Sequence, residues 1–336
     1  MIALKKIVAK NQDIEVISEV KPNVKPSYLL IKTLYTAISP GTELTLINVS
    51  ENRQIDLGYS GVGVVEECGE EVDGYNVGDL VACYGAPYVK HSEYLLVPKT
   101  LCCKVPGNVD PKEAALGGIG AIAIHALRIA RLQFGERIVV AGLGIIGQLV
   151  AQIAHAAAYD VYAYDLSPER TSLLNSIPSI RLYTNMEDLS RSLTAAGDYG
   201  GADAVLLCAG GKHSILTQQS LKWVRDKGKV VIVGDIEPDF PRSDMFAKEA
   251  EILISRAGGP GRYDLSYERD AVDYPYGFVR WTEGRNLGEY IRLLSEKKIN
   301  VRPYVGEEVK MEEIKTAFQS LADKSSSVLT KVIRYS

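Results

Sequence analysis

The stretch VVAGLGIIG, residues 139–147, decides the fold of this 336-residue chain. An apolar strand runs into Gly142, Gly144 and Gly147, which have the spacing G-x-G-x-x-G, and a helix is predicted directly afterwards over Gln148–Ala157. In the order strand, glycine turn, helix, this pattern is typical of a dinucleotide site. Gly142 permits the tight turn, Gly144 lets the backbone approach a pyrophosphate, and Gly147 lets the helix pack closely on the strand.

Apolar strands alternate with helical stretches around this motif. The predicted strands are Arg137–Gly144, Val161–Asp165, Ile180–Thr184, Ala202–Gly210, Lys229–Asp235 and Glu251–Gly259. Their continuous apolar character favours strands that are covered on both faces, as in a parallel sheet. Six such strands joined by helices predict a doubly wound α/β domain of the Rossmann type.

The flanking segments differ from this pattern. The first hundred residues predict short strands separated by turn residues, as in a small, bent β domain; the clearest are Tyr28–Thr36, Gly61–Gly69, Asp79–Gly85 and His91–Pro98. Residues 111–135 predict one or two helices, with Pro111 in the first turn and Gly135 as the terminator. Beyond residue 261, helices are expected near 286–298 and 311–323, and a strand near 328–334.

The dinucleotide site is expected at the carboxyl ends of the strands. Asp165 ends the second strand, where a carboxylate accepts hydrogen bonds from ribose hydroxyls and repels a 2′-phosphate, so NAD is favoured over NADP. Arg170 is a possible phosphate partner, although at a helix start it is more often solvated. The helix N-terminus favours the phosphates. The predicted contacts are Gly142, Gly144, Ile145, Ile146, Gly147, Asp165, Arg170, Cys208, Ala209, Gly210, Gly234 and Asp235.

Composition excludes several classes of protein. Hydrophobic residues make up 46% of the chain and charged residues 24%, so the chain can build sizeable cores. The formal charge of −4 argues against a nucleic-acid binder, and five cysteines with four histidines argue against a disulfide scaffold or a metal-rich protein. No window is long and apolar enough to span a membrane, and the N-terminus lacks the apolar segment of a signal peptide. We expect a cytoplasmic protein.

Motifs along nearly the whole chain resemble the medium-chain dehydrogenase/reductase superfamily, which includes zinc alcohol and sorbitol dehydrogenases. They are SPGTE (39–43), GYSGVGVV (58–65), HSEYLLVP (91–98), IHALR (124–128) and GLGIIG (142–147). A closer resemblance, carried by LGYS (57–60), LGGIGAIAIHALR (116–128) and the run from Gly259 to Asn286, is to the dehydrogenase half of bi-domain oxidoreductases of surface-polysaccharide biosynthesis.

The resemblance implies a Rossmann domain inserted into a β-rich, GroES-like catalytic domain. The expected boundaries are 1–119 and 261–336 for the catalytic domain and 120–260 for the NAD-binding domain. It also implies a homodimer that pairs through the edge strand of the Rossmann sheet, near Ile252–Ser255.

The chain departs from the family at the zinc ligands. At the three ligand positions it has Pro40, Tyr59 and Gly118, and the four-cysteine structural-zinc lobe is missing. We therefore expect no zinc, since none of these side chains is a zinc ligand. The expected catalytic residues are Tyr59, which would need a lowered pKa to act as a base, Thr42 at the family's hydroxyl position, and Glu43.

Arginines and tyrosines late in the chain suit sugars that carry phosphate or nucleotide groups. The late candidates, which equally could only clamp the domains together, are Arg256, Arg262, Tyr263, Arg280, Trp281 and Glu283. Two further substrate contacts, Tyr84 and Tyr88, are expected in a shortened loop over the cleft. The expected function is a zinc-independent NAD(H) oxidoreductase that interconverts a secondary alcohol and a ketone on a sugar-, nucleotide-sugar- or cyclitol-like substrate. The alternatives are a quinone or enoyl reductase, or a non-catalytic NAD-binding partner of another oxidoreductase.

Overall fold

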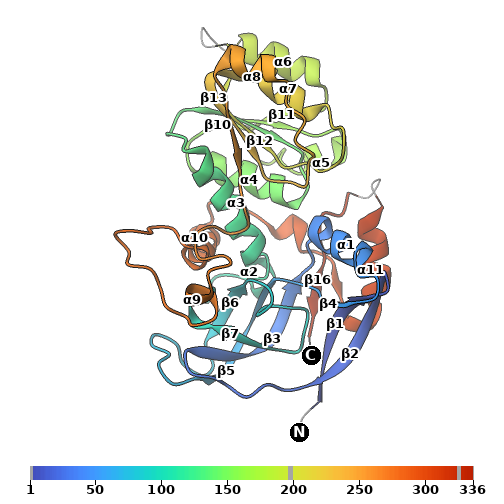
Figure 1. Ribbon diagram of the computed structural model, residues 1–336, viewed down its shortest axis with the longest axis vertical. Coiled ribbons are helices and arrows are strands. Elements are labelled where there is room, and N and C mark those ends of the chain that lie inside the picture. Colours follow the sequence, from blue (N-terminus) through green and yellow to red (C-terminus); the bar gives the residue numbers. More distant parts are fainter. Residues whose placement is uncertain (1–2, 196–199, 324–326, 336) are drawn as a thin grey trace. The chain divides into compact units, whose positions relative to one another are not determined.

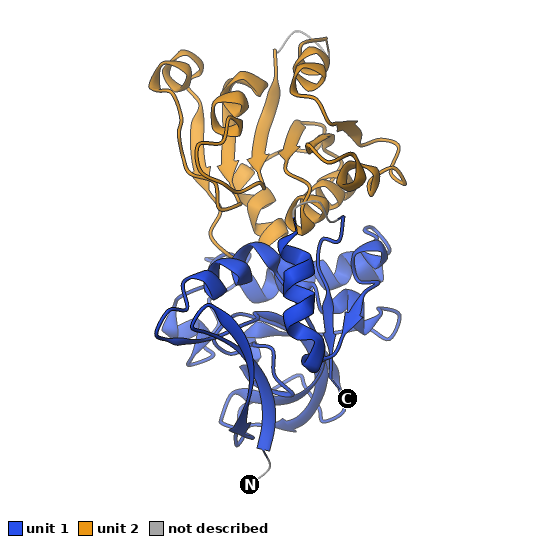
Figure 2. Cartoon of the chain, turned by 90° about the vertical axis from the view of Figure 1, so that its right-hand side faces the viewer, with its two compact units in different colours: residues 1–121, 258–336 blue, residues 122–257 orange. Residues whose placement is uncertain are grey.

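The computed structural model describes residues 3–195, 200–323 and 327–335 (Figure 1). It divides into two compact units (Figure 2): residues 1–121 with 258–336, and residues 122–257. The second unit is thus inserted into the sequence of the first. The sequence analysis drew these boundaries at 119/120 and 260/261, within three residues of the observed divisions.

The inserted unit is built on one parallel sheet of six strands in the order β11-β10-β9-β12-β13-β14. The strands are β9 (Arg137–Ala141), β10 (Asp160–Tyr164), β11 (Arg181–Tyr183), β12 (Ala202–Leu207), β13 (Val224–Ile232) and β14 (Glu251–Ile254). The helices are α3 (Gly117–Ala130), which begins in the other unit, α4 (Ile145–Ala156), α5 (Pro168–Ser172), α6 (Met186–Ala195), α7 (Leu216–Trp223) and α8 (Arg242–Lys248). This order reverses between β9 and β12, as in doubly wound dinucleotide-binding sheets, and the predicted fold class is confirmed.

Several predicted bounds in this unit were wrong. β12 ends at Leu207 and β14 at Ile254, so the glycine-containing residues after them form loops instead of extending the strands. β13 begins at Val224, five residues before the predicted start. α4 begins at Ile145 instead of Gln148, so Gly147 lies inside its first turn. α3 ends at Ala130, so Gly135 lies in the following loop and does not terminate the helix.

The other unit holds two sheets. One has the order β2-β1-β4, and the other β15-β16-β3-β5-β6-β8, with β7 also paired to β3. The strands are β1 (Ala3–Lys10), β2 (Asp13–Val20), β3 (Tyr28–Ala37), β4 (Gln54–Asp56), β5 (Ser60–Cys68), β6 (Leu80–Tyr84), β7 (Tyr94–Pro98), β8 (Cys102–Lys104), β15 (Glu308–Val309) and β16 (Val332–Arg334). The helices are α1 (Pro40–Asn48), α2 (Pro111–Ala114), α9 (Leu265–Glu268), α10 (Glu283–Ser295) and α11 (Ile314–Ala322), with the 3-10 turns Lys99–Leu101, Arg302–Tyr304 and Met311–Glu313.

Two features of this unit differ from the expectations in ways that matter for the site. The segment SPGTE (39–43), for which no helix was expected, leads into helix α1, because Pro40 suits a first helical turn and the Ser39 amide donates to Glu43 Oε1 (2.7 Å). His91 does not begin a strand, since β7 starts at Tyr94.

Strand β14 is an edge of the parallel sheet, as predicted, and its Ile254 side chain is exposed. Among the described residues, no helix combines the length and the apolar character needed to cross a bilayer.

Candidate functional site

The turn between β9 and α4 is formed by glycines under different constraints. Gly142 has a φ of +97°, and a Cβ there would lie 2.6 Å from the amide nitrogen of Ala209. A Cβ on Gly147 would lie 1.8 Å from the carbonyl oxygen of Gly142, so only glycine allows this contact of helix and turn. Nothing lies within 4 Å of the Cβ position of Gly144. The turn therefore offers an open stretch of backbone at the position expected to hold a pyrophosphate.

The first turn of α4 adds hydrogen-bond donors to this stretch. The first intrahelical bond runs from Gln148 N to Gly144 O (2.9 Å), so the amides of Ile145, Ile146 and Gly147 precede it and lack partners within the helix. Unpaired amides and the positive end of a helix dipole attract anions. These residues fit a dinucleotide pyrophosphate.

Asp165 follows β10 directly and is fixed beside the glycine turn. Its Oδ2 accepts a hydrogen bond from Leu143 N (2.6 Å) and its Oδ1 from Ser167 N (2.9 Å). Each carboxylate oxygen retains a further lone pair, which a ribose hydroxyl can use. The negative charge disfavours a phosphate in the same place.

Arg170 is half-buried and not solvated as expected. It lies in α5, where its carbonyl oxygen accepts a hydrogen bond from Gln148 Nε2 (2.7 Å) on α4. Its Nε is buried and has no hydrogen-bond partner among the described residues. A cation with an unused donor thus lies close to the helix that begins at the glycine turn.

The loops after β12 and β13 meet at the same edge of the sheet. Cys208 N donates to Ala141 O (2.8 Å), and a Cβ on Gly234 would lie 2.2 Å from Ala209 O. Asp235 O accepts from Gly211 N (2.9 Å), and a Cβ on Gly210 would lie 3.1 Å from the same oxygen. Burial raises the pKa of the Cys208 thiol to about 12, so the thiol is neutral. The structure therefore brings these strand-end residues together with Gly142.

The other unit places hydroxyl groups where the resemblance implies zinc ligands. The phenol of Tyr59 donates a hydrogen bond to Ser39 Oγ (2.7 Å), and the hydroxyl of Thr42, near the start of α1, also interacts with it. Burial raises the pKa of Tyr59, so the phenol stays protonated. The lowered pKa that a general base would need is therefore not present, and Tyr59 is suited to donate a hydrogen bond and not to act as a free base.

The residues at the three ligand positions do not fit a catalytic zinc. Pro40 has no donor atom, and Tyr59 is a neutral phenol. Gly118 donates its amide to Ser60 Oγ (2.8 Å), and a Cβ there would lie 2.5 Å from the ring of Tyr84, so the space is filled by protein. Zinc in proteins is bound by thiolates, imidazoles and carboxylates. No group of three or more His, Cys, Asp or Glu within residues 3–195, 200–323 and 327–335 could hold a metal ion.

Behind this cluster lies a pair that the sequence did not reveal. Glu43 and His91 are completely buried, and Glu43 Oε2 lies 2.7 Å from His91 Nε2. The other ring nitrogen, Nδ1, lies 2.7 Å from Thr36 Oγ1. Nothing in the spacing of residues 43 and 91 in the sequence indicates that the two side chains meet. In the structure Gly58, whose φ is +94° and whose Cβ would lie 2.8 Å from His91 Nδ1, leaves the room that the imidazole needs.

A second buried polar group lies near Tyr59. Tyr84, which is the last residue of β6 and not part of a loop, packs edge-on against Tyr59 with ring centroids 6.0 Å apart. Arg262 forms a largely buried ion pair with Glu268. The carboxyl of Glu283 is fully buried beside this pair and receives no hydrogen bond from any described donor. Burial, together with the charge of Glu268, raises the pKa of Glu283 to about 8.

The surroundings of the other expected substrate contacts differ from one another. The guanidinium of Arg280 stacks on the ring of Trp281 (3.8 Å), Tyr88 packs edge-on against Tyr28, and the Tyr263 side chain is exposed. Arg256 belongs to the inserted unit.

Two family models match the chain. The alcohol dehydrogenase GroES-like domain matches residues 25–132, and the zinc-binding dehydrogenase model matches residues 146–270. Together with the relatives below, these matches define an oxidoreductase of the alcohol dehydrogenase type. The chain belongs to the medium-chain dehydrogenase/reductase superfamily and is alcohol- and sorbitol-dehydrogenase-like. The zinc-binding dehydrogenase model, which matches residues 146–270, does not cover positions 40, 59 and 118.

Curated relatives are distant. The chain is 29% identical over 208 residues to (R,R)-butanediol dehydrogenase of Bacillus subtilis, an alignment that spans 55% of this chain and 60% of the relative. It is 24% identical to sorbitol dehydrogenase of Halalkalibacterium halodurans, over 80% of both chains. Among solved structures, galactitol-1-phosphate dehydrogenase of Escherichia coli matches with a TM-score of 0.80 at 18% identity, over 98% of this chain and all of that one, which is a likeness of fold.

Proposed function

We propose that the chain is an NAD(H)-dependent oxidoreductase that interconverts a secondary alcohol and a ketone on a sugar-, nucleotide-sugar- or cyclitol-like substrate, without zinc. The observation that carries this proposal is the hydroxyl cluster of Tyr59, Ser39 and Thr42 at the positions where the resemblance implies a metal site. A carbonyl oxygen that gains negative charge needs a hydrogen-bond donor or a Lewis acid. A protonated phenol is such a hydrogen-bond donor, so the reaction needs no Lewis acid.

Each unit supplies one requirement of the reaction. The glycine turn, the amides of the first turn of α4 and Asp165 fit a dinucleotide, whose nicotinamide ring accepts or gives the hydride when bound. When substrate binds, the phenol of Tyr59 turns its one hydroxyl hydrogen from Ser39 to the oxygen of the substrate and accepts from the Ser39 hydroxyl instead, and Thr42 offers a second hydroxyl. A preference for NAD over NADP rests on the charge of Asp165.

The class of substrate is inferred from two observations. Curated relatives include sorbitol dehydrogenase and D-xylulose reductase, and their names describe polyol and ketose chemistry. The polar groups of Tyr84 and Glu283 near Tyr59 suit hydroxyl-rich molecules. The argument from arginines for a phosphate group is weakened, because Arg262 is already neutralised by Glu268.

The test is a screen of polyols, sugars, nucleotide sugars and cyclitols with NAD and with NADP, followed at 340 nm. We expect oxidation of at least one secondary alcohol, faster with NAD. Quinone or enoyl reduction with NADPH as the sole activity would favour the reductase alternative. Tight NAD binding with no turnover on any compound would favour a non-catalytic NAD-binding protein.

We also propose a homodimer that pairs through β14. An unpaired edge strand with an exposed Ile254 is suited to antiparallel pairing with its copy across a two-fold axis.

A further inference from the structure

Two cysteines face each other across neighbouring strands of the unit formed by residues 1–121 and 258–336. Cys83 on β6 and Cys102 on β8 are register partners in an antiparallel pair of strands. The chain has five cysteines, and all of them are free thiols in the structure. Among the described strands, no other two cysteines are register partners. Cys83 and Cys102 are therefore the pair whose joining the fold favours.

The hydrogen bonds of Cys102 identify the type of strand pair. Its backbone amide donates to Lys99 O, and its carbonyl oxygen accepts from the hydroxyl of Tyr75 (2.8 Å), so both groups have partners outside β6. This is the pattern of a non-hydrogen-bonded pair, in which the two Cα atoms lie about 4.5 Å apart. A disulfide spans Cα atoms that are roughly 4.4–6.8 Å apart. The backbone at Cys83 and Cys102 thus already has the separation that a disulfide needs.

The two side chains also point to the same side of the sheet. Cys83 and Cys102 belong to one apolar core cluster, as expected for residues directly opposite each other on antiparallel strands. Cys103, the next residue of β8, points to the other side, where its Sγ would lie 3.6 Å from a Cβ on Gly288 of α10. On β8, Cys102 and not Cys103 therefore presents its thiol to Cys83.

Only weak contacts hold the thiols in their present orientations. Cys83 Sγ lies 3.5 Å from Gly61 O, and Cys102 Sγ lies 3.7 Å from Pro98 O. A thiol is a weak hydrogen-bond donor, so both contacts can be given up at little cost. Each side chain then needs to turn about its Cα–Cβ bond from one staggered position to another for the two sulfurs to meet.

We propose that Cys83 and Cys102 are a modification site for peroxides, at which oxidation joins β6 to β8 through a disulfide. Hydrogen peroxide oxidises the first thiol to a sulfenic acid, and one water molecule is released. The second thiol attacks the sulfenic sulfur, the S–O bond breaks, and a second water molecule leaves. Two thiols and one hydrogen peroxide thus give one disulfide and two water molecules. The proposal does not depend on the alcohol–ketone chemistry proposed above.

Exposure indicates which thiol reacts first. Cys102 is 7% exposed and lies on β8, a strand of three residues at the edge of its sheet, whereas Cys83 is 0% exposed. Short edge strands open more easily than central ones, so peroxide reaches Cys102 before Cys83. Burial raises the pKa of both thiols, that of Cys83 to about 12. Because the thiolate is the nucleophile, the reaction is slow at neutral pH and becomes faster as the pH rises.

The disulfide closes a loop that includes part of the candidate site. Residues 84–101 lie between the two cysteines, and they begin with Tyr84, whose ring packs edge-on against Tyr59. A cross-link that closes such a loop restricts the unfolded chain. We expect the equilibrium constant for unfolding of this unit to fall about tenfold or more on oxidation. The end of β6 that carries Tyr84 would then be held more firmly.

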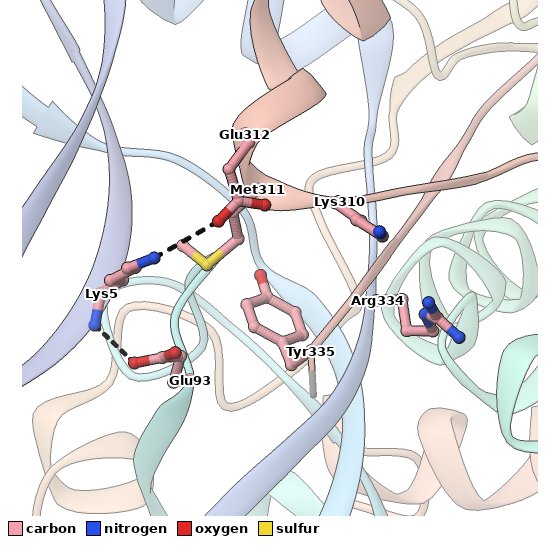
Figure 3. Close-up of a pocket in the computed structure, with 7 residues that line it drawn as sticks. All are labelled: Lys5, Glu93, Lys310, Met311, Glu312, Arg334 and Tyr335. Atoms are coloured by element: carbon pink, nitrogen blue, oxygen red, sulfur yellow. Dashed lines mark hydrogen bonds and ion pairs between the residues drawn. The ribbon is translucent and has the colours of Figure 1, made fainter.

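The direct test is peptide mapping of the native protein after treatment with hydrogen peroxide. The remaining thiols are alkylated in denaturant, and a linked pair of peptides that contain Cys83 and Cys102 should appear, with the free thiols reduced from five by two. Peroxide also oxidises thioethers. Figure 3 shows the sulfur of Met311 at a surface cavity of about 490 Å³ in the same unit. Mapping separates the two products, because a sulfoxide gains an oxygen atom whereas the linked peptides lose two hydrogen atoms.

Variants make the assignment specific. Cys83→Ala and Cys102→Ala should lose the linked peptides, whereas Cys103→Ala, the matched control on the same strand, should keep them. Urea unfolding of the wild type and of Cys103→Ala should shift to higher urea after oxidation, and that of Cys83→Ala should not. Five free thiols after oxidation, a linkage between Cys102 and Cys103, or a linkage that forms only in unfolded protein would overturn the proposal. So would a linked wild type that unfolds at the same urea concentration as the reduced protein.

Discussion

Replacing Glu283 by glutamine should stabilise the protein at alkaline pH. The carboxyl of Glu283 is 0% exposed, has no donor partner among the described residues and lies beside the carboxylate of Glu268. Its pKa rises from 4.5 to about 8. A glutamine side chain at this position would keep the shape of the protonated acid and could donate to Glu268 without ever becoming charged.

The direction of the effect follows from the two protonation equilibria. Below about pH 4.5 the carboxyl is protonated in both the folded and the unfolded chain. Between about pH 4.5 and about pH 8 the unfolded chain loses the proton and the folded chain keeps it, so the free energy of unfolding falls as the pH rises. Above about pH 8 the carboxyl is ionised in both the folded and the unfolded chain, and the free energy of unfolding falls no further. The free energy of unfolding of the Glu283→Gln variant does not fall in this way, because glutamine does not ionise.

The size of the effect follows from the shift. A rise from 4.5 to about 8 corresponds to at most roughly 5 kcal/mol between the two protonation states. Relaxation and water penetration around an ionised buried carboxylate reduce the measured penalty. We therefore expect Glu283→Gln to be more stable than the wild type by about 2 kcal/mol near pH 9, and by less than about 1 kcal/mol near pH 5.

Urea unfolding at the two pH values measures the difference, and hydrogen exchange of peptides from α10 assigns it to this unit. Glu70→Gln, at an exposed glutamate of the same unit, is the control and should show no such pH dependence. If the Glu283 variant followed the wild type at both pH values, or were the less stable protein near pH 9, the assignment of a buried neutral carboxyl would be wrong.

Three further predictions concern the cofactor and the assembly. Asp165→Asn should shift the ratio of kcat/KM for NAD over NADP about tenfold or more towards NADP, because it removes the charge that repels a 2′-phosphate; an unchanged ratio would contradict that role. Gly147→Ala should abolish tight NAD binding in calorimetry, because its Cβ would lie 1.8 Å from the Gly142 oxygen, whereas Gly144→Ala, with nothing within 4 Å, should keep the fold intact by circular dichroism. Ile252→Pro in the edge strand should convert the dimer into a monomer on light scattering, and a wild-type monomer would refute the proposed pairing.

The sequence predicted the parts of the molecule that depend on local pattern. Gly142, Gly144 and Gly147 lie within nine consecutive residues, and the strand, turn and helix that they require are adjacent in the chain, so the dinucleotide turn was predictable. The position of Asp165 at the end of the second strand was predictable from the length of one strand–helix–strand unit. The departures at Pro40, Tyr59 and Gly118 were also predictable, because a residue that cannot bind zinc is evident from its type alone.

The parts that failed depend on contacts between distant segments. His91 meets Glu43 only because the loop before β7 packs on helix α1, which local pattern did not predict. The raised pKa of Tyr59 follows from its burial, which no spacing in the chain reveals. Glu283 lies near Arg262 and Glu268 in the sequence, but its lack of a hydrogen-bond donor is a property of the packed core.

The most direct test of the central claim is turnover with NAD by metal-depleted protein, wild type and Tyr59→Phe, on the best substrate from the screen. The account predicts that chelation leaves the wild-type kcat unchanged and that Tyr59→Phe lowers it by about 10²-fold or more. Tyr75→Phe, which removes a part-buried hydroxyl bonded to Cys102 O elsewhere in the same unit, should retain activity. Turnover that required stoichiometric zinc, or a Tyr59→Phe variant as active as the wild type, would contradict the claim.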